Sequence, residues 1–500
     1  MRYPHHRHLF HLPTSEQAAR PQDLVKPDDL TWRDYLLMLL HIDAGIEHGL
    51  MVQYLYAAYS LGGDQVPPDK RALVRRWQQT LLSIAKEEMG HLLTVQNVIT
   101  CLGGALELDR QDYPWDHDFY PFPFELEPLT LDSLAKYVYT EAPEGWGQGQ
   151  PHSTALKRSI KRNKASVLQR VVHGRVPLKP NVKSVSALFK VVLEVVSDPQ
   201  RIPDETFEGG TFAQQACWAA WARNHGQVSG EDAQEPLQDG EPTTRPKPTC
   251  PTQADVLVVP VATRDDVILA LKQVAEQGEA THDELEKSHF ARFLEVYEEF
   301  EKAFPEGSPV SPSRPLPINP TTLGRIHRQD GDMSQRETPI THPVTRQWAA
   351  LFDLRYRLLL TGLLHTFRLP RHTSPYSSAG TYQALTHRTF GEMYNLKALA
   401  DILVRSPLHP EGQPFQPAGP AFQMPYTLEL PANPLNIWLQ YNDILQACAT
   451  LRIQILEVPS LSSNQRRYLL AMADCDREMQ CWLATQIDDA RRVTMSACQG

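Results

Sequence analysis

Residues 84–93 read IAKEEMGHLL, and this stretch indicates both the fold and the chemistry of the chain. It lies in a helical pattern from about 69 to 102, between a Pro-Pro pair and a Gly-Gly pair, which are typical helix boundaries. Apolar residues at helical spacing form one core-facing stripe: Leu73, Trp77, Leu81, Ile84, Ala85, Leu92, Val95, Ile99 and Leu102. Glu88 and His91 fall on or beside the stripe, one turn apart. Helical bundles present a carboxylate and an imidazole to a metal in this way.

A lone Glu-x-x-His also arises by chance, as a surface Glu beside a satisfied His, so the preceding helix matters. Thr31 and Asp34 form a variant capping box, which predicts a helix over 32–61. The apolar stripe of this helix includes Glu47, with Asp43 one turn before it and Tyr54 two turns after it. Asp43 and Glu47 could instead flank the stripe and face water. The pattern nevertheless predicts an inward Glu packed antiparallel to the Glu-x-x-His helix.

Two later helical patterns, over about 265–277 and 283–304, complete a four-helix set. The first ends near Glu276 and Glu279, either of which could face the core. The second begins with Glu286-x-x-His289. A helical bundle that binds two metal ions takes one Glu from each of two helices and a Glu-x-x-His motif from each of the other two. The four helical patterns of this chain offer this set. The other interpretation is a bundle whose inward polar groups only bond one another.

The rest of the chain predicts an all-α protein with two helical bundles. Residues 105–255 form an insertion that begins with a strap rich in proline and aromatic residues and contains a basic run over 157–183. Residues 1–30 read as a tail, 31–305 as the metal-binding bundle, 306–345 as a linker and 346–500 as a C-terminal helical domain. Further helices are expected at 131–140, 185–197, 211–223, 346–368, 380–405, 434–457 and 462–492.

Composition limits the function classes. The net charge of −10 gives no reason to expect nucleic acid as a partner. Seven cysteines without a Cys-x-x-Cys pair favour a reducing compartment, which we expect to be the cytoplasm. No signal peptide is visible, and no apolar run reaches the roughly 20 residues that span a bilayer. We therefore expect no membrane association.

Several motifs together resemble the ferritin-like domain shared by iminophenyl-pyruvate dimer synthase and the chromopyrrolate synthases. They lie at 41–60 (HIDAGIEHGLMVQYLYAAYS), 86–97 (KEEMGHLLTVQN), 120–129 (YPFPFELEPL), 276–279 (EQGE), 288–293 (SHFARF), 352–356 (FDLRY) and 418–422 (AGPAF). The resemblance covers most of 31–455. It implies a ferritin-like four-helix bundle with a metal centre formed by Glu47, Glu88, His91, Glu279, Glu286 and His289. Ala280 stands where the family usually has a second glycine after the Gln-Gly-Glu sequence. The chain resembles only the ferritin-like part of the iminophenyl-pyruvate dimer synthases, without their large additional region.

Carboxylates and imidazoles without thiolates favour iron or manganese over structural zinc. We expect two iron ions per chain, with manganese as the other suitable metal; haem is associated with some relatives of this family. Relatives oxidatively couple two indole-derived imines. The resemblance thus implies an oxidoreductase that uses O₂ or peroxide on an amino-acid-derived small molecule in secondary-metabolite biosynthesis, in a form compatible with a homodimer.

Within such a site, Glu47 and Glu88 are the expected catalytic carboxylates. Tyr54 is a candidate hydrogen-bond donor behind the ligands or an electron relay, and core packing is the competing role. One alternative function is a non-catalytic scaffold that binds a partner enzyme through the second bundle. Iron storage is disfavoured because the long straps would obstruct the assembly of a cage.

Overall fold

The computed structural model describes residues 26–116, 120–143, 146, 154–173, 185–207, 215–216, 256, 258–279, 288–323, 336–369, 379–411, 414–424 and 428–497. Its helices are α2 (Trp32–Ser60), α3 (Arg71–Cys101), α4 (Leu131–Thr140), α5 (Thr154–His173), α6 (Val185–Ser197), α8 (Arg264–Glu279), α9 (His289–Ala303), α10 (Pro343–Thr366), α11 (Ala379–Leu403), α12 (Pro434–Leu456) and α13 (Ser463–Ala497). Strand β1 (Pro320–Thr321) pairs in parallel with β2 (Thr338–Pro339). The predicted all-α class is confirmed.

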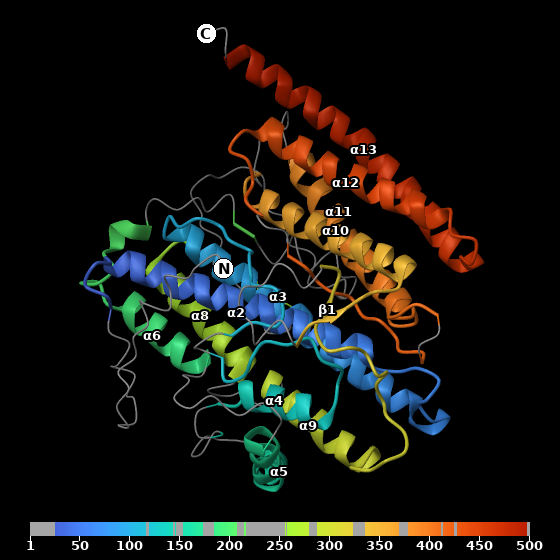
Figure 1. The fold of residues 1–500 in the computed structure, drawn as a ribbon. Coiled ribbons are helices and arrows are strands. Elements are labelled where there is room, and N and C mark those ends of the chain that lie inside the picture. The colour runs from blue at the N-terminus through green and yellow to red at the C-terminus, as the bar shows by residue number, and fades with distance from the viewer. Residues whose placement is uncertain are drawn as a thin grey trace, which may run out of the picture.

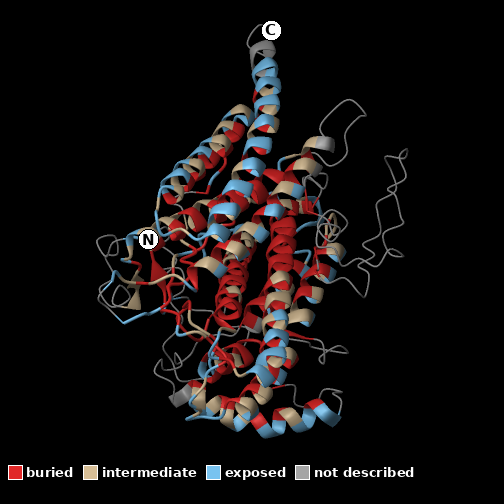
Figure 2. Ribbon diagram, turned by 90° about the vertical axis from the view of Figure 1, so that its right-hand side faces the viewer, coloured by how far each residue is buried: buried red, intermediate tan, exposed pale blue. Residues whose placement is uncertain are grey.

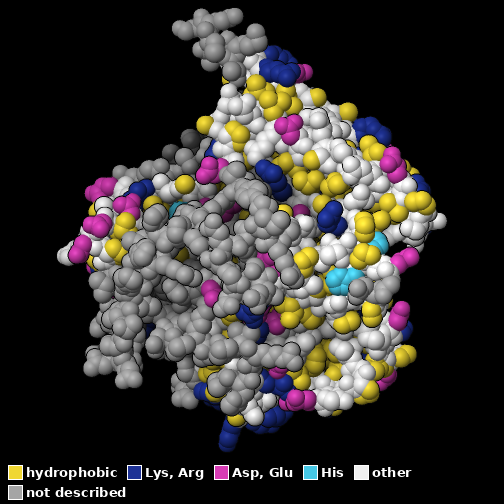
Figure 3. All heavy atoms as spheres, in the orientation of Figure 1, with side chains coloured by type: hydrophobic (Ala, Val, Ile, Leu, Met, Phe, Trp, Pro, Cys, Tyr) yellow, Lys and Arg dark blue, Asp and Glu magenta, His cyan; other side chains and the backbone are white. Residues whose placement is uncertain are grey.

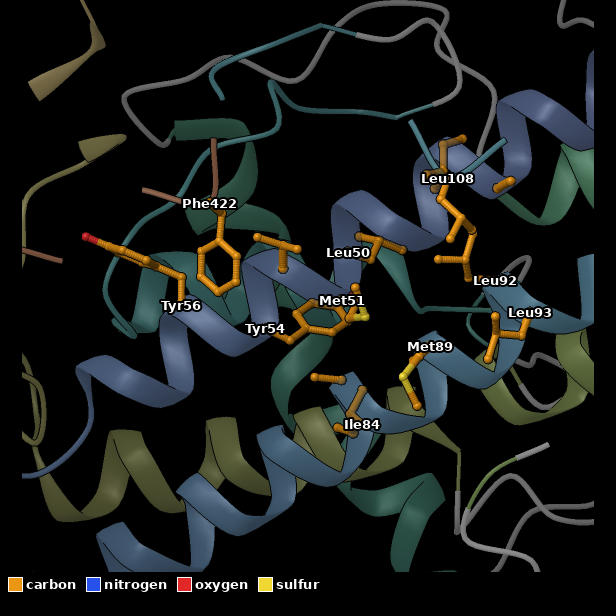
Figure 4. Packing of buried hydrophobic residues seen from close by; sticks show 14 of the residues in the cluster. Leu50, Met51, Tyr54, Tyr56, Ile84, Met89, Leu92, Leu93, Leu108 and Phe422 are labelled. Atoms are coloured by element: carbon orange, nitrogen blue, oxygen red, sulfur yellow. The ribbon is translucent and has the colours of Figure 1, made fainter. Parts of the chain in front are cut away.

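The two long helices α2 and α3 form the centre of the first bundle (Figure 1). The Thr31 side chain accepts a hydrogen bond from the Asp34 amide and so begins α2 where the sequence predicts. Met51 and Tyr54 on α2 lie towards Ile84 and Met89 on α3 (Figure 4). All four side chains are buried, so the interface between these helices is a continuous part of the core.

Shorter helices surround this pair. α4 packs along α9, and α6 packs against both α2 and α8. The Thr130 side chain and Ser133 form a capping box that begins α4 at the predicted residue. Helices α2, α3, α4, α8 and α9 therefore converge on one region of the first bundle, which Figure 1 shows below the second bundle.

Two helix boundaries near the candidate ligands differ from the predictions, and one helix was not predicted. α9 begins at His289, not near 283, because the Ser288 hydroxyl accepts a hydrogen bond from the Ala291 amide and caps the helix there. α8 continues through Gly278 to Glu279 rather than ending at Gln277. The basic run is largely a helix, α5, which was not predicted. The expected helix over 211–223 and most of the N-terminal tail lie outside the described residues.

Buried residues are concentrated along the inner helices, whereas the end of α13 near the C-terminus is exposed (Figure 2). On the face shown in Figure 3, Lys and Arg side chains are interspersed with Asp and Glu, so the charge there is mixed. Within the described part of the chain, α2 is long and apolar enough to cross a membrane. However, 78% of its most apolar window is buried inside the fold, as in a core helix.

A buried hydrogen-bond chain joins the first bundle to the second, which comprises α10–α13. His48 Nδ1 lies 2.9 Å from the Leu108 carbonyl oxygen and must carry the proton to donate to it. His48 Nε2 therefore accepts from the Tyr356 hydroxyl, which in turn lies 3.4 Å from Arg110 Nη2. Burial and the nearby Arg110 charge hold the pKa of His48 well below its usual range, so the ring is neutral.

A buried ionic network connects the four helices of the second bundle. Arg355 on α10 donates to Glu392 on α11 at 3.1 Å and also to Asp476 on α13. Arg452 on α12 donates to the same Asp476 oxygen. Arg355 is fully buried, so its two carboxylate partners compensate a charge that water does not reach.

We predict that Arg355→Ala lowers the free energy of unfolding by about 3–5 kcal/mol, because it removes one partner of a buried ionic network. Urea unfolding followed by circular dichroism measures this change. Arg477→Ala is the control: this exposed residue of α13 pairs only with exposed Asp474 within the described structure, and we expect a change within about 0.5 kcal/mol. Equal effects of the two substitutions would contradict a stabilising role of Arg355 in the buried network.

Candidate metal centre

The first group of candidate ligands comes from the two central helices. Glu47 lies on α2, and Glu88 and His91 lie one turn apart on α3. His91 Nδ1 is 3.0 Å from Glu88 Oε2 and 3.5 Å from Glu47 Oε2. One ligand atom from each residue lies within 4.8 Å of the others, and all three side chains are buried. This group has the size and composition of a metal site.

The second group shares Glu88 with the first. Its other members are Glu141, the residue that ends α4, and His289, the first residue of α9. Glu88 Oε1 is 2.8 Å from His289 Nδ1, and Glu141 Oε2 is 3.8 Å from the same nitrogen. The His91 and His289 rings lie nearly parallel with centroids 5.3 Å apart. Glu88 therefore directs one oxygen towards each imidazole and can bridge two ions.

Further polar side chains hold both imidazoles from behind. His91 Nε2 lies 2.9 Å from the Gln277 side-chain oxygen on α8. His289 Nε2 lies 3.0 Å from Glu87 Oε2, and Arg292 donates to both oxygens of Glu87. Partners of this kind fix the orientation of a histidine and make its other nitrogen a better metal ligand. The ring nitrogens that face the centre are thus Nδ1 in both cases.

Tyr54 supports the other end of the second group. Its hydroxyl donates to Glu141 Oε1, while Glu141 Oε2 faces His289. The Tyr54 ring is fully buried and packs against Tyr137. Burial, followed by the nearby Glu141 charge, raises the pKa of Tyr54 well above its usual range, so the phenol keeps its proton.

Charge and burial shift the pKa values of the ligands in opposite directions. Burial and the Glu88 charge raise the pKa of Glu141 to about 7. Burial alone would lower the pKa of His289, but Glu88 and Glu87 outweigh it and raise the value to about 9. Burial raises the pKa of Glu88, yet His289 and His91 hold it well below its usual range. Before metal binds, the imidazoles therefore carry protons that balance the carboxylates.

Buried polar atoms that make no hydrogen bond indicate whether these residues fit a metal ion. In the described structure, Glu47 Oε2, Glu88 Oε1 and His289 Nδ1 are buried and make no hydrogen bond. Glu88 Oε1 and His289 Nδ1 have the separation of an ion pair, but their angles are not those of a hydrogen bond. Buried polar atoms are normally satisfied, and a metal ion that replaced the imidazole protons would satisfy all three of these atoms. Carboxylate and imidazole ligands suit iron or manganese, and the residues fit such an ion.

Asp43 adds another carboxylate one turn from Glu47. It is only 1% exposed, and both of its oxygens lack a hydrogen-bond partner among the described residues. Burial raises the pKa of Asp43 to about 8, with His91 opposing the shift and Glu88 adding to it. The alternative that Asp43 and Glu47 face water is therefore wrong.

The structure brings together four of the six ligands implied by the sequence: Glu47, Glu88, His91 and His289. Glu276 is exposed and belongs to neither group of candidate ligands. The Glu279 side chain and the whole of Glu286 lie outside the described residues, so their roles remain predictions.

Sequence reasoning missed Glu141, Glu87 and Gln277. A signal for Glu141 was available, since it extends the helical spacing of Leu134 and Val138 and so lies on the inward face of α4. Glu87 and Gln277 each adjoin a residue that was singled out in the sequence. Only the three-dimensional arrangement assigns them to His289 and His91.

A narrow, partly open pocket reaches the centre. Its polar side is formed by Glu47, Glu88, His91, Thr140 and Glu141, and its apolar side by Leu50, Val185, Phe189, Val274, Ala275 and Gly278. Apolar side chains of α6 and α8 therefore face the candidate ligands across this pocket.

Comparisons with known proteins agree with this geometry. A family model described as ferritin-like matches residues 40–298. Dichlorochromopyrrolate synthase from Lentzea aerocolonigenes is 25% identical over an alignment of 425 positions, which covers 79% of this chain and 36% of that protein. The chain therefore spans about a third of the length of this relative. No solved structure gives a significant match.

We predict that metal affinity rises with pH. Metal binding must displace the protons of Glu141 and His289, whose pKa values are about 7 and about 9. The apparent dissociation constant for ferrous or manganous ion should therefore fall between about pH 6 and pH 9, and binding should release protons. Anaerobic calorimetry in buffers of different ionisation enthalpy measures both quantities. Affinity that does not change over this range would contradict the proposed ligands.

Glu87→Gln should weaken metal binding by about 10–100-fold, because it removes the charge that holds His289 from behind. Glu299→Gln is a matched control, since Glu299 also accepts from an arginine and from a ring N–H, those of Arg76 and Trp77. We expect Glu299→Gln to keep the affinity of the natural chain. Metal-competition titrations with a chromogenic chelator compare the variants, and equal losses in both would contradict a specific role for Glu87.

Proposed function

The chain belongs to the ferritin-like family, and from this premise we propose that it is a metal-dependent oxidoreductase. It would use O₂ or peroxide on an amino-acid-derived substrate in secondary-metabolite biosynthesis. The observation that carries the proposal is the position of Glu88, which serves two buried carboxylate–imidazole groups with one oxygen each. Structural ion pairs do not require both oxygens of one carboxylate to face separate imidazoles.

Two metal ions would be held by the two groups: one by Glu47, Glu88 and His91, and the other by Glu88, Glu141 and His289. We propose iron, with manganese as the other metal that this ligand set suits. Bound iron would supply the one-electron steps that O₂ chemistry requires and that protein side chains alone do not provide.

The residues of the chain have separate roles in this proposal. Glu47 and Glu88 are the carboxylates that would hold the ions, with Glu88 common to both groups. Glu87 and Gln277 keep the imidazoles oriented. Phe189 and the other apolar residues of the pocket keep water from one side of the centre, which favours reaction with a bound substrate.

The relative in Lentzea aerocolonigenes supports the proposed metabolic setting. Its name assigns it the synthesis of dichlorochromopyrrolate. The present chain spans 36% of that protein at 25% identity. Secondary metabolism and an amino-acid-derived substrate are thus our proposals for this chain, and they do not extend to the same product.

We predict that the purified chain binds close to two iron ions and that Glu88→Gln loses most of both, because Glu88 belongs to both groups. Elemental analysis and an anaerobic-to-aerobic absorbance titration test this prediction, with an O₂-dependent band expected for the natural chain and lost in Glu88→Gln. Glu125→Gln is the control, since Glu125 is a buried carboxylate paired with Lys136 and Arg336 outside the centre. A natural chain that binds no iron or manganese under metal-replete conditions would refute the proposal.

A further inference from the structure

Two buried tyrosines pack against each other, and one of them contacts a candidate ligand. The rings of Tyr54 and Tyr137 meet edge to face with centroids 4.9 Å apart, and each ring is fully buried. Both also pack against Phe293, at 4.8 and 5.4 Å between centroids. The two rings therefore share apolar neighbours, and Tyr137 serves as a matched comparison for Tyr54.

Their hydroxyl groups have different partners. The Tyr54 hydroxyl donates to Glu141 Oε1, and Glu141 belongs to the second group of candidate ligands. The Tyr137 hydroxyl has no hydrogen-bond partner among the described residues. Tyr54 thus has a carboxylate base at its O–H bond, whereas Tyr137 has none.

This difference decides which phenol can be oxidised. Loss of an electron alone would leave a positive charge on a ring that is surrounded by apolar side chains, and an isolated charge there is very costly. Loss of an electron together with a proton leaves a neutral phenoxyl radical. That reaction needs a base in hydrogen-bond contact with the hydroxyl.

We propose that Tyr54 is a redox-active residue that gives one electron and one proton when the metal centre is oxidised. This inference rests on the proposed function, since the oxidant is the metal centre after its reaction with O₂. The O–H bond of Tyr54 breaks, the proton moves to Glu141 Oε1, and the electron reduces the centre by one unit. The remaining product is a neutral Tyr54 phenoxyl radical.

The electrons balance for complete reduction of one O₂ to two waters, which takes four electrons and four protons. Two electrons come from two bound ferrous ions, one comes from Tyr54, and one comes from a further ferrous ion in solution. Without substrate, the Tyr54 radical should persist because Tyr137 and Phe293 enclose its ring and water does not reach it.

The test uses the full chain, loaded anaerobically with ferrous ion in excess and mixed with O₂, without substrate. Samples frozen at successive times are examined by electron paramagnetic resonance. We expect a tyrosyl radical in the natural chain, its loss in Tyr54→Phe, and its retention in Tyr137→Phe. Iron content is measured in each variant, so that loss of the radical is separated from loss of metal.

A second measurement does not depend on removing the hydroxyl. Site-specific 3-fluorotyrosine at position 54 should add fluorine hyperfine splitting to the radical signal, whereas the same residue at position 137 should leave the signal unchanged. A signal that Tyr54→Phe retains, or fluorine splitting from position 137 instead, would overturn the inference. So would an iron-loaded natural chain that reacts with O₂ but forms no radical, although the proposed function would survive. Failure to bind iron would refute both.

Discussion

The candidate metal centre depends on a single carboxylate, Glu88, that contacts two imidazoles inside the first bundle. Its two oxygens lie 3.0 Å from His91 Nδ1 and 2.8 Å from His289 Nδ1. The site is buried, so these charges interact strongly and must nearly cancel. Each imidazole can therefore remain there only as a cation paired with carboxylates or as a neutral ligand of a metal ion. The pairing of these opposite charges explains why the pKa of Glu88 is lowered while the pKa of the neighbouring His289 is raised.

Charge balance also accounts for the residues behind the ligands. Glu87 directly precedes Glu88 on α3, yet its carboxylate contacts His289 Nε2 and Arg292. Burial would raise the pKa of Glu87, but hydrogen bonds and charge interactions with His289 and Arg292 outweigh burial, and the pKa falls to about 2. These two partners compensate the negative charge that Glu87 adds beside an already acidic site. Glu87 is thus a permanent anion, whereas the protonation of Glu141 can change with the state of the centre.

Features that recur at helical spacing could be predicted from the sequence, whereas features that depend on a single residue or hydrogen bond could not. Helices α2 and α3 and their inward Glu47, Glu88 and His91 follow from apolar spacing, because each face recurs over many turns. Glu141 was missed because it caps the end of a short helix within an insertion and belongs to no repeated motif such as Glu-x-x-His. The start of α9 was misplaced because a single hydrogen bond from the Ala291 amide to the Ser288 hydroxyl decides it, and apolar periodicity does not register a cap.

Two adjacent residues of α2 connect the metal centre to the second bundle. Glu47 faces the ligands, while His48 turns to the other side of the helix and accepts a hydrogen bond from Tyr356 on α10. A helix places neighbouring side chains about 100° apart, so these two buried residues face different surfaces of α2. The family match ends at residue 298, yet the position of Glu47 also depends on Tyr356. The second bundle is therefore part of the structure that holds the centre, and a chain that ends with the matched region would expose His48 and loosen α2 where it carries a ligand.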